Sequence, residues 1–168
     1  MKSILVCFAV LFVGGVAWAD PIVRWDRIEG NLQDAAEDAI EVAGIPSSER
    51  GVTITSGKAV FDLATGFLSF KVEGLSYDRH YPANDRPIGT YPGGLRMATI
   101  VCDSTRTPEV VDSPPVSVVD GNLSYRGFIF VPASCRERPE LIVLLLRLAG
   151  PGPRYGDFFA YGAHRTIK

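Results

Sequence analysis

One stretch of the sequence, residues 77–94, concentrates side chains that could do chemistry. YDRHYPANDRPIGTYPGG contains three tyrosines, three prolines, two arginines, two aspartates and one of the two histidines of the chain. A hydrolase needs a nucleophile, a base and an orienting acid in contact, and Ser76, His80 and Asp78 supply these residue types. Residues so close in sequence rarely reach that arrangement, and the motifs GxSxG, HExxH and SxxK are absent. We therefore expect no catalytic residue here. A small secreted hydrolase that uses the 77–94 loop is the alternative function.

The same loop carries oxygen atoms of the kind that calcium binds, on Asp78, Asn84 and Asp85. Their spacing matches no EF-hand loop. Arg79 and Arg86 lie beside them and would repel a cation. The sequence therefore predicts no metal site, and no motif in it indicates a cofactor.

The tyrosines and arginines of the loop are the residue types that binding surfaces favour. Amphipathic rings and guanidinium groups contact a large area and lose little conformational entropy when they are ordered. A second interpretation is an ordered connection, stiffened by its three prolines, in which the tyrosines pack inward. The sequence leaves both interpretations open. The binding candidates are Tyr77, Arg79, His80, Tyr81, Arg86 and Tyr91.

The first residues of the chain have the layout of a cleaved secretory signal. Lys2 precedes an apolar run over 4–13, and Ala17-Trp18-Ala19 places small residues at positions −3 and −1 before Asp20. The apolar run is too short to span a bilayer. We expect cleavage between Ala19 and Asp20, a secreted or periplasmic protein, and no membrane span after signal removal.

Charge and cysteine content limit the partners further. The formal net charge is −2, and removal of residues 1–19 takes away Lys2 and no acidic residue. A mildly acidic chain without a basic cluster argues against a nucleic-acid partner.

Of three cysteines, Cys102 and Cys135 remain after cleavage. In an oxidising compartment such a pair predicts one disulfide bond.

The elements that must position the loop are mostly strands. Apolar residues at helical spacing predict one helix over 31–43, with Asn31 as its N-cap and Gly44 and Pro46 at its end. From Gly51 onward the apolar period changes to two. This pattern predicts a hairpin over 58–63 and 68–73 with a turn at 64–66. It also predicts a hairpin over 116–119 and 123–131 through Asp120-Gly121, and strands over 95–102, 141–148 and 158–165.

Short strands separated by Gly/Pro turns indicate an all-β fold. We expect a single-domain antiparallel β-sandwich, or a partly open barrel, with one short N-terminal helix. The expected organisation is a signal peptide over 1–19, an N-terminal helical segment over 20–50 and a β-sandwich domain over 51–168.

Several stretches also resemble a recurring pattern: GVTITSGKAVFDLATGFLSFKVEGL, TIVCDS, VDSPPVSVVDGNLSYRGFIFVPASC and LIVLLLRL. They are similar to a group of small exported bacterial proteins with two paired cysteines and a VDSPxVxxxxxGxxxF-like stretch. The resemblance covers roughly residues 51–165. It implies an exported all-β domain and carries no catalytic residue across. We therefore expect an exported, non-enzymatic binding or envelope-associated structural module whose partner is an unknown protein or glycan.

Overall fold

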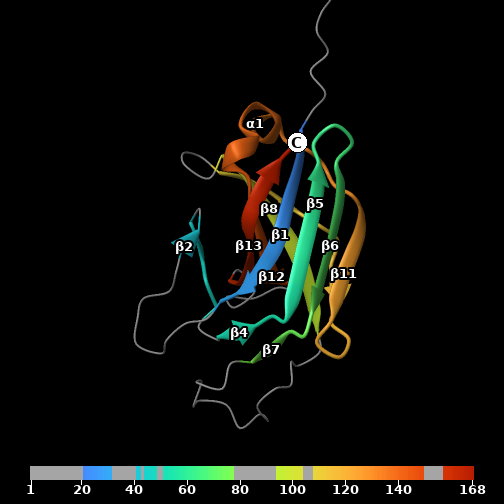
Figure 1. Cartoon of the computed structure of the whole chain (residues 1–168). Coiled ribbons are helices and arrows are strands. Elements are labelled where there is room, and N and C mark those ends of the chain that lie inside the picture. Colours follow the sequence, from blue (N-terminus) through green and yellow to red (C-terminus); the bar gives the residue numbers. More distant parts are fainter. Residues whose placement is uncertain are drawn as a thin grey trace, which may run out of the picture.

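The computed structural model describes residues 21–31, 41–42, 44–48, 51–77, 94–103, 108–149 and 157–168. Most of them lie in one antiparallel sheet with strand order β10-β8-β12-β13-β1-β5-β6-β11, in which β9 also pairs with β8 (Figure 1). Its strands are β1 (Ile22–Gly30), β5 (Ser56–Asp62), β6 (Phe67–Glu73), β8 (Leu95–Cys102), β9 (Glu109–Asp112), β10 (Val116–Ser117), β11 (Leu123–Phe128), β12 (Val143–Leu148) and β13 (Phe158–Ile167).

Two small two-stranded sheets and two short helices complete the described fold. β2 (Glu41–Val42) pairs with β3 (Ile45–Pro46), and β4 (Val52–Thr53) pairs with β7 (Ser76–Tyr77). The helices are α1 (Ala133–Glu137) and the 3-10 helix η1 (Pro139–Leu141). Neither of them has the length that a helix needs to cross a bilayer.

The large sheet curls into a half-barrel, so the all-β, antiparallel class is confirmed. Its two end strands, β10 and β11, follow each other in the chain. They are joined by a turn in which Asp120 and Gly121 have φ of 48° and 72°, which confirms the predicted Asp-Gly turn. The prediction that the strands on either side of this turn pair with each other is wrong. β10 pairs with β8, and β11 pairs with β6. Pro114 and Pro115 precede β10 and lack the amide donors that a longer ladder would need.

The other predicted strands agree well with the structure. β5 and β6 form the expected hairpin, with Phe61 opposite Leu68 and Gly66 at φ 78° in the turn. β8 covers the predicted residues, and β13 runs two residues past the predicted end. β12 begins at Val143 rather than at residue 141, because the chain before it forms η1.

The N-terminal part of the described chain differs from the prediction. The segment 20–50 was expected to be helical and outside the β domain, yet Ile22–Gly30 forms β1 between β13 and β5. The predicted helix is also wrong at both ends: Asn31 is buried directly after β1, and Glu41–Val42 forms β2. Residues 32–40 lie outside the described part. Charged residues interrupt the apolar alternation of β1, so its sequence gives a weak strand signal.

The concave side of the sheet holds the main core. Val23 and Trp25 of β1 pack there with Phe61, Leu68 and Leu144 of neighbouring strands, all of them buried. A disulfide bond between Cys102 and Cys135 joins β8 to α1, with a Cα–Cα distance of 4.8 Å. The predicted cysteine pairing is therefore confirmed.

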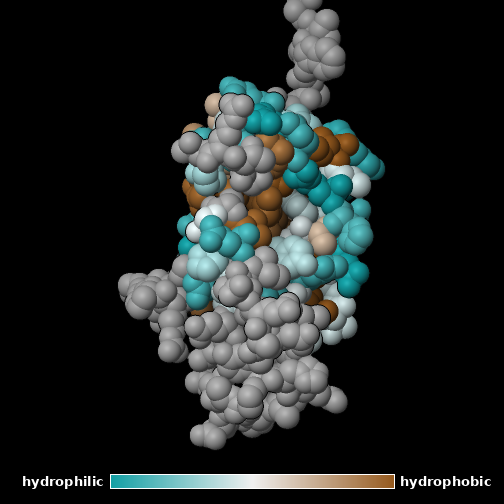
Figure 2. Space-filling view, turned by 90° about the vertical axis from the view of Figure 1, so that its left-hand side faces the viewer, coloured by the Kyte–Doolittle hydropathy of each residue, from teal (hydrophilic) through white to brown (hydrophobic). Residues whose placement is uncertain are grey.

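A second, smaller apolar cluster lies on the other side of the sheet. Val101, Leu145 and Phe158 of β8, β12 and β13 are buried there against Val42 and Ile45 of the β2–β3 hairpin. Hydrophobic residues reach the surface in the middle of this side of the molecule (Figure 2). Two covered faces explain why β12 is apolar at nearly every position.

Candidate functional site

A cavity of about 250 Å³ lies where the end of β1 meets β4 and β13. β1 and β13 supply charged and phenolic side chains, and β4 supplies a hydroxyl and an apolar wall. The lining residues that carry the chemistry are Arg27, Glu29, Asn31, Val52, Thr53 and Tyr161. The cavity therefore combines hydrogen-bond donors, hydrogen-bond acceptors and an apolar surface.

The centre of the site is the Glu29 carboxylate, in which each of the two oxygens contacts a neighbouring side chain. Glu29 and Tyr161 are directly opposite each other in the β1–β13 ladder. The Tyr161 hydroxyl donates to Glu29 Oε2 at 2.9 Å, and Arg27 Nε lies 3.1 Å from Glu29 Oε1. The side chain of Glu29 is 28% exposed and that of Arg27 is 65% exposed, so the guanidinium group faces solvent at the rim. The three side chains form one connected polar group.

Burial of the Tyr161 ring raises the pKa of its hydroxyl above 10.0, and the hydrogen bond to Glu29 and its negative charge raise this pKa further. All three causes favour the neutral phenol, because a buried phenolate loses solvation and would lie beside the negative carboxylate. Tyr161 is therefore a hydrogen-bond donor at neutral pH.

Backbone contacts hold the wall between β1 and β4 in place. The Asn31 amide donates to the Phe159 carbonyl and the Asn31 carbonyl accepts from Val52, both at 2.8 Å. The buried Asn31 side chain donates through Nδ2 to the Ser48 carbonyl at 2.7 Å. A Cβ on Gly30 would lie 1.9 Å from the Val52 carbonyl oxygen, so only glycine permits this close approach.

The cavity adjoins the first residue of the loop that the sequence singled out. Tyr77 pairs with Val52 across β7 and β4, is partly buried and packs against the main core. The hydroxyls of Thr53 and Ser76 share a hydrogen bond at 2.7 Å beside this pair. The remaining binding candidates lie outside the described residues: Arg79, His80, Tyr81, Arg86 and Tyr91.

Sequence reasoning missed Arg27, Glu29 and Tyr161. The signal that was present is the partial alternation of apolar and charged residues in IVRWDRIEG, which is interrupted at Asp26-Arg27. Nothing in the sequence relates that strand to Tyr161, because the two come together only through the β1–β13 pairing.

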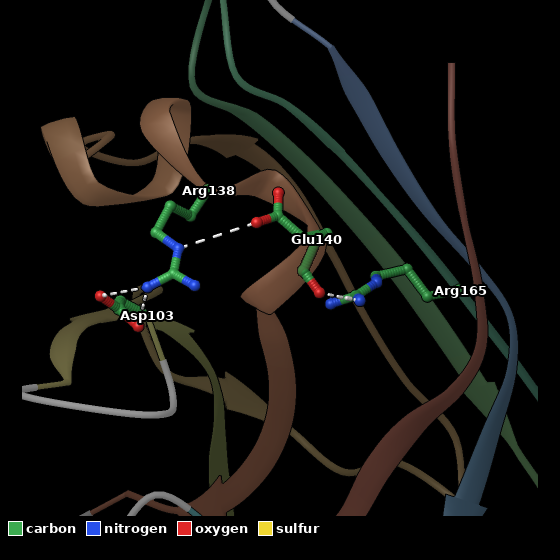
Figure 3. A network of polar contacts seen from close by, with 4 residues as sticks. All are labelled: Asp103, Arg138, Glu140 and Arg165. Atoms are coloured by element: carbon green, nitrogen blue, oxygen red, sulfur yellow. Dashed lines mark hydrogen bonds and ion pairs between the residues drawn. The ribbon is translucent and has the colours of Figure 1, made fainter.

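A second polar network lies near α1 and has a structural role (Figure 3). Arg138 Nη1 lies 3.4 Å from Asp103 Oδ1, and its Nε lies 3.7 Å from Glu140 Oε1. Arg165 of β13 donates to the carbonyls of Glu140 and Ile142, at and just after η1. Burial lowers the pKa of Arg165, against the charge of Glu140, which raises it. These contacts hold η1 on the end of the sheet.

Among the described residues, no three or more His, Cys, Asp or Glu side chains are grouped as metal ligands would be. No protein-family model, curated protein or solved structure matches the chain. The geometry of the cavity is therefore the basis for assigning a function.

Proposed function

We propose that this protein is an exported, non-enzymatic binding module that recognises a polar group of its partner in the cavity between β1, β4 and β13. The observation that carries the proposal is the Glu29 carboxylate, held by Arg27 on one oxygen and Tyr161 on the other. Such a group is preorganised, because its side chains are already fixed before a ligand arrives, and preorganisation reduces the entropic cost of binding.

The same arrangement favours binding over catalysis. A carboxylate has about four acceptor positions on its two oxygens, and in Glu29 one position on each oxygen is taken by Arg27 or Tyr161, so the orientation of the group is fixed for binding. The described residues that line the cavity include no histidine and no cysteine. The hydrolase alternative would use Asp78 and His80 of the 77–94 loop together with a serine. The hydroxyl of Ser76, the serine directly before the loop, shares a hydrogen bond with the hydroxyl of Thr53.

The chemistry of the cavity indicates the kind of group that it accepts. Arg27 offers donors at the rim, and Val52 and Ile54 offer an apolar surface. The hydroxyls of Thr53 and Tyr161 are hydrogen-bonded to Ser76 and Glu29, and their oxygens can still accept a hydrogen bond from a ligand. A protein side chain or a sugar residue of a glycan combines polar and apolar surface in this way. Tyr77 stands at the start of the loop with the other candidate tyrosines and arginines, so this loop would extend the contact.

Two features support export. Residues 1–19 have the layout of a secretory signal, and the Cys102–Cys135 disulfide suits an oxidising compartment such as the periplasm. In this setting the curled sheet would serve as a rigid sandwich-like or partly open barrel scaffold for the cavity and the adjoining loop.

The proposal is tested by partner capture with matched variants. Wild-type protein is applied to a glycan array and used in a pull-down from the native host, beside the double variant Arg27→Gln/Tyr161→Phe. The control is Lys58→Gln on β5, which changes an exposed residue that does not line the cavity. We expect the double variant to lose most of the binding and the control to retain it.

Equal binding by the double variant and the wild type would rule out the cavity as the recognition site. A hydrolytic activity of the wild type that His80→Ala abolishes would replace the binding function with the hydrolase alternative. A thermal melt of each variant separates loss of binding from loss of folding.

A further inference from the structure

β11 forms one end of the large sheet, and no described strand pairs with its outer side. The Ile129 amide donates to the Gly66 carbonyl at 2.9 Å. This bond shows that the odd-numbered residues of β11 direct their backbone groups toward β6. In an antiparallel ladder, every second residue bonds to the same neighbour. The amides and carbonyls of Ser124, Arg126 and Phe128 therefore point away from β6.

The side chains of these residues and of Phe130 are exposed, and two of them are phenylalanines. Phe128 is 69% exposed and Phe130 is 72% exposed, the two highest values among the large hydrophobic residues of the described chain. The Phe128 and Phe67 rings form an edge-type contact, with a centroid distance of 5.6 Å. On this edge the Phe128 carbonyl accepts a long hydrogen bond of 3.4 Å from the Tyr125 hydroxyl. Two exposed phenylalanines, two residues apart at the end of an edge strand, are typical of a strand that pairs with another chain.

The opposite end of the sheet is protected against such pairing, and β11 is not. Pro114 and Pro115 interrupt the edge formed by β9 and β10, and Glu109 and Asp112 add exposed negative charge there. Prolines and charges are the usual means by which edge strands avoid association. β11 has neither a proline nor an acidic residue, and Arg126 is its only charge.

We propose that two copies of this chain associate by antiparallel pairing of their β11 edges, with the two-fold axis at Phe128. In this register the two Phe128 side chains are directly opposite each other, and Arg126 of each copy lies opposite Phe130 of the other. A guanidinium group beside an aromatic ring is attracted to the ring face. The pattern Arg-x-Phe-x-Phe is thus complementary to itself when it runs in the reverse direction.

Two features select this register. Pairing centred on Arg126 would place like charges directly opposite each other, which destabilises a strand pair. In the proposed register Ser124 lies opposite Pro132, which has no amide to donate, so the new ladder ends there. The paired segment therefore spans residues 126–130 of each copy.

The test uses cysteine crosslinking in the full chain with Cys7 replaced by serine, so that an introduced cysteine is the only free thiol. Directly opposite residues in an antiparallel pair have Cα atoms about 5.5 Å apart, within the range of a disulfide. We expect Phe128→Cys to form a covalent dimer on mild oxidation. Ser124→Cys, on the same edge but opposite Pro132, should stay mostly monomeric.

Sedimentation of the protein without an introduced thiol provides a second measurement, independent of whether the cysteine variants fold. We expect a concentration-dependent dimer that Phe128→Lys converts to a monomer with an unchanged thermal melt. A monomer at all concentrations would overturn the proposal. Equal crosslinking of both cysteine variants, or growth into larger oligomers, would overturn it as well, because the proposed pair is closed and has one register.

Discussion

The Tyr161 hydroxyl lies 2.9 Å from the Glu29 carboxylate although 132 residues separate the two in the chain. The contact exists because β13 pairs with β1 in the register that places these residues directly opposite each other. Arg27 adds the third member from the same strand as Glu29. The candidate site is thus a product of strand pairing between the two ends of the described chain.

The raised pKa of Tyr161 predicts a loss of stability at alkaline pH. Above about pH 10 the unfolded chain releases the phenolic proton while the folded chain retains it, so the free energy of unfolding falls as pH rises toward the folded pKa. We expect the urea midpoint of the wild type to decrease more between pH 8 and pH 10.5 than that of Tyr161→Phe. Equal decreases in both proteins would contradict the assignment.

The packing of Trp25 against Gly162 predicts that an added methyl group destabilises the sheet. A Cβ on Gly162 would lie 2.4 Å from Trp25 Cδ1, against a ring that is buried in the core. We expect Gly162→Ala to lower the free energy of unfolding by about 1–3 kcal/mol. The matched control is Gly127→Ala on β11, whose Cβ would meet the far end of the Tyr125 side chain. Chemical denaturation of both variants measures the difference, and an equal loss would show that the ring contact has no special role.

The Cys102–Cys135 disulfide closes a loop with a sequence separation of 33 and anchors α1 to β8. Its removal by Cys102→Ala/Cys135→Ala should lower the free energy of unfolding by about 3–4 kcal/mol in the chain-entropy model. Denaturant unfolding of the variant and the oxidised wild type gives this value. Titration of the unfolded, unreduced protein without residues 1–19 should find no free thiol, and two free thiols would refute the bond.

Export makes a separate prediction about processing. The small residues at Ala17 and Ala19 favour cleavage before Asp20. N-terminal sequencing of protein recovered from the periplasm or the medium should therefore start at Asp20. Retention of Met1 in exported protein would contradict the signal assignment.

The 77–94 loop makes a prediction that its residue types alone support. If the loop extends the binding surface, Tyr81→Ala/Arg86→Ala should weaken partner capture and shift the melting temperature little. His80→Ala should leave both nearly unchanged. A large drop in melting temperature with normal capture would instead show that the loop is a structural connection.

The sequence by itself determined the local features of this protein. The β5–β6 hairpin follows from alternation around Gly66, the turn at Asp120-Gly121 follows from residues that tolerate positive φ, and the disulfide follows from the pairing of the two remaining cysteines. The hairpin and the turn depend on residues close in sequence, and the disulfide depends on the number of cysteines. For the same reason the ends of β8 and β12 could be predicted to within about two residues.

Only the tertiary structure decided how these pieces meet. β1 has a weak strand signal in its own sequence, yet it lies between β13 and β5. Its backbone pairs with both of these strands, and its Trp25 side chain is buried in the core. Strands β10 and β11 separate after a correctly predicted turn: β10 pairs with β8 over two residues, and β11 pairs with β6 over six residues. Pairing between distant strands depends on the whole set of available edges, and residue patterns within a strand do not specify which edge it joins. The Glu29–Tyr161 contact and the unprotected edge of β11 both follow from that choice.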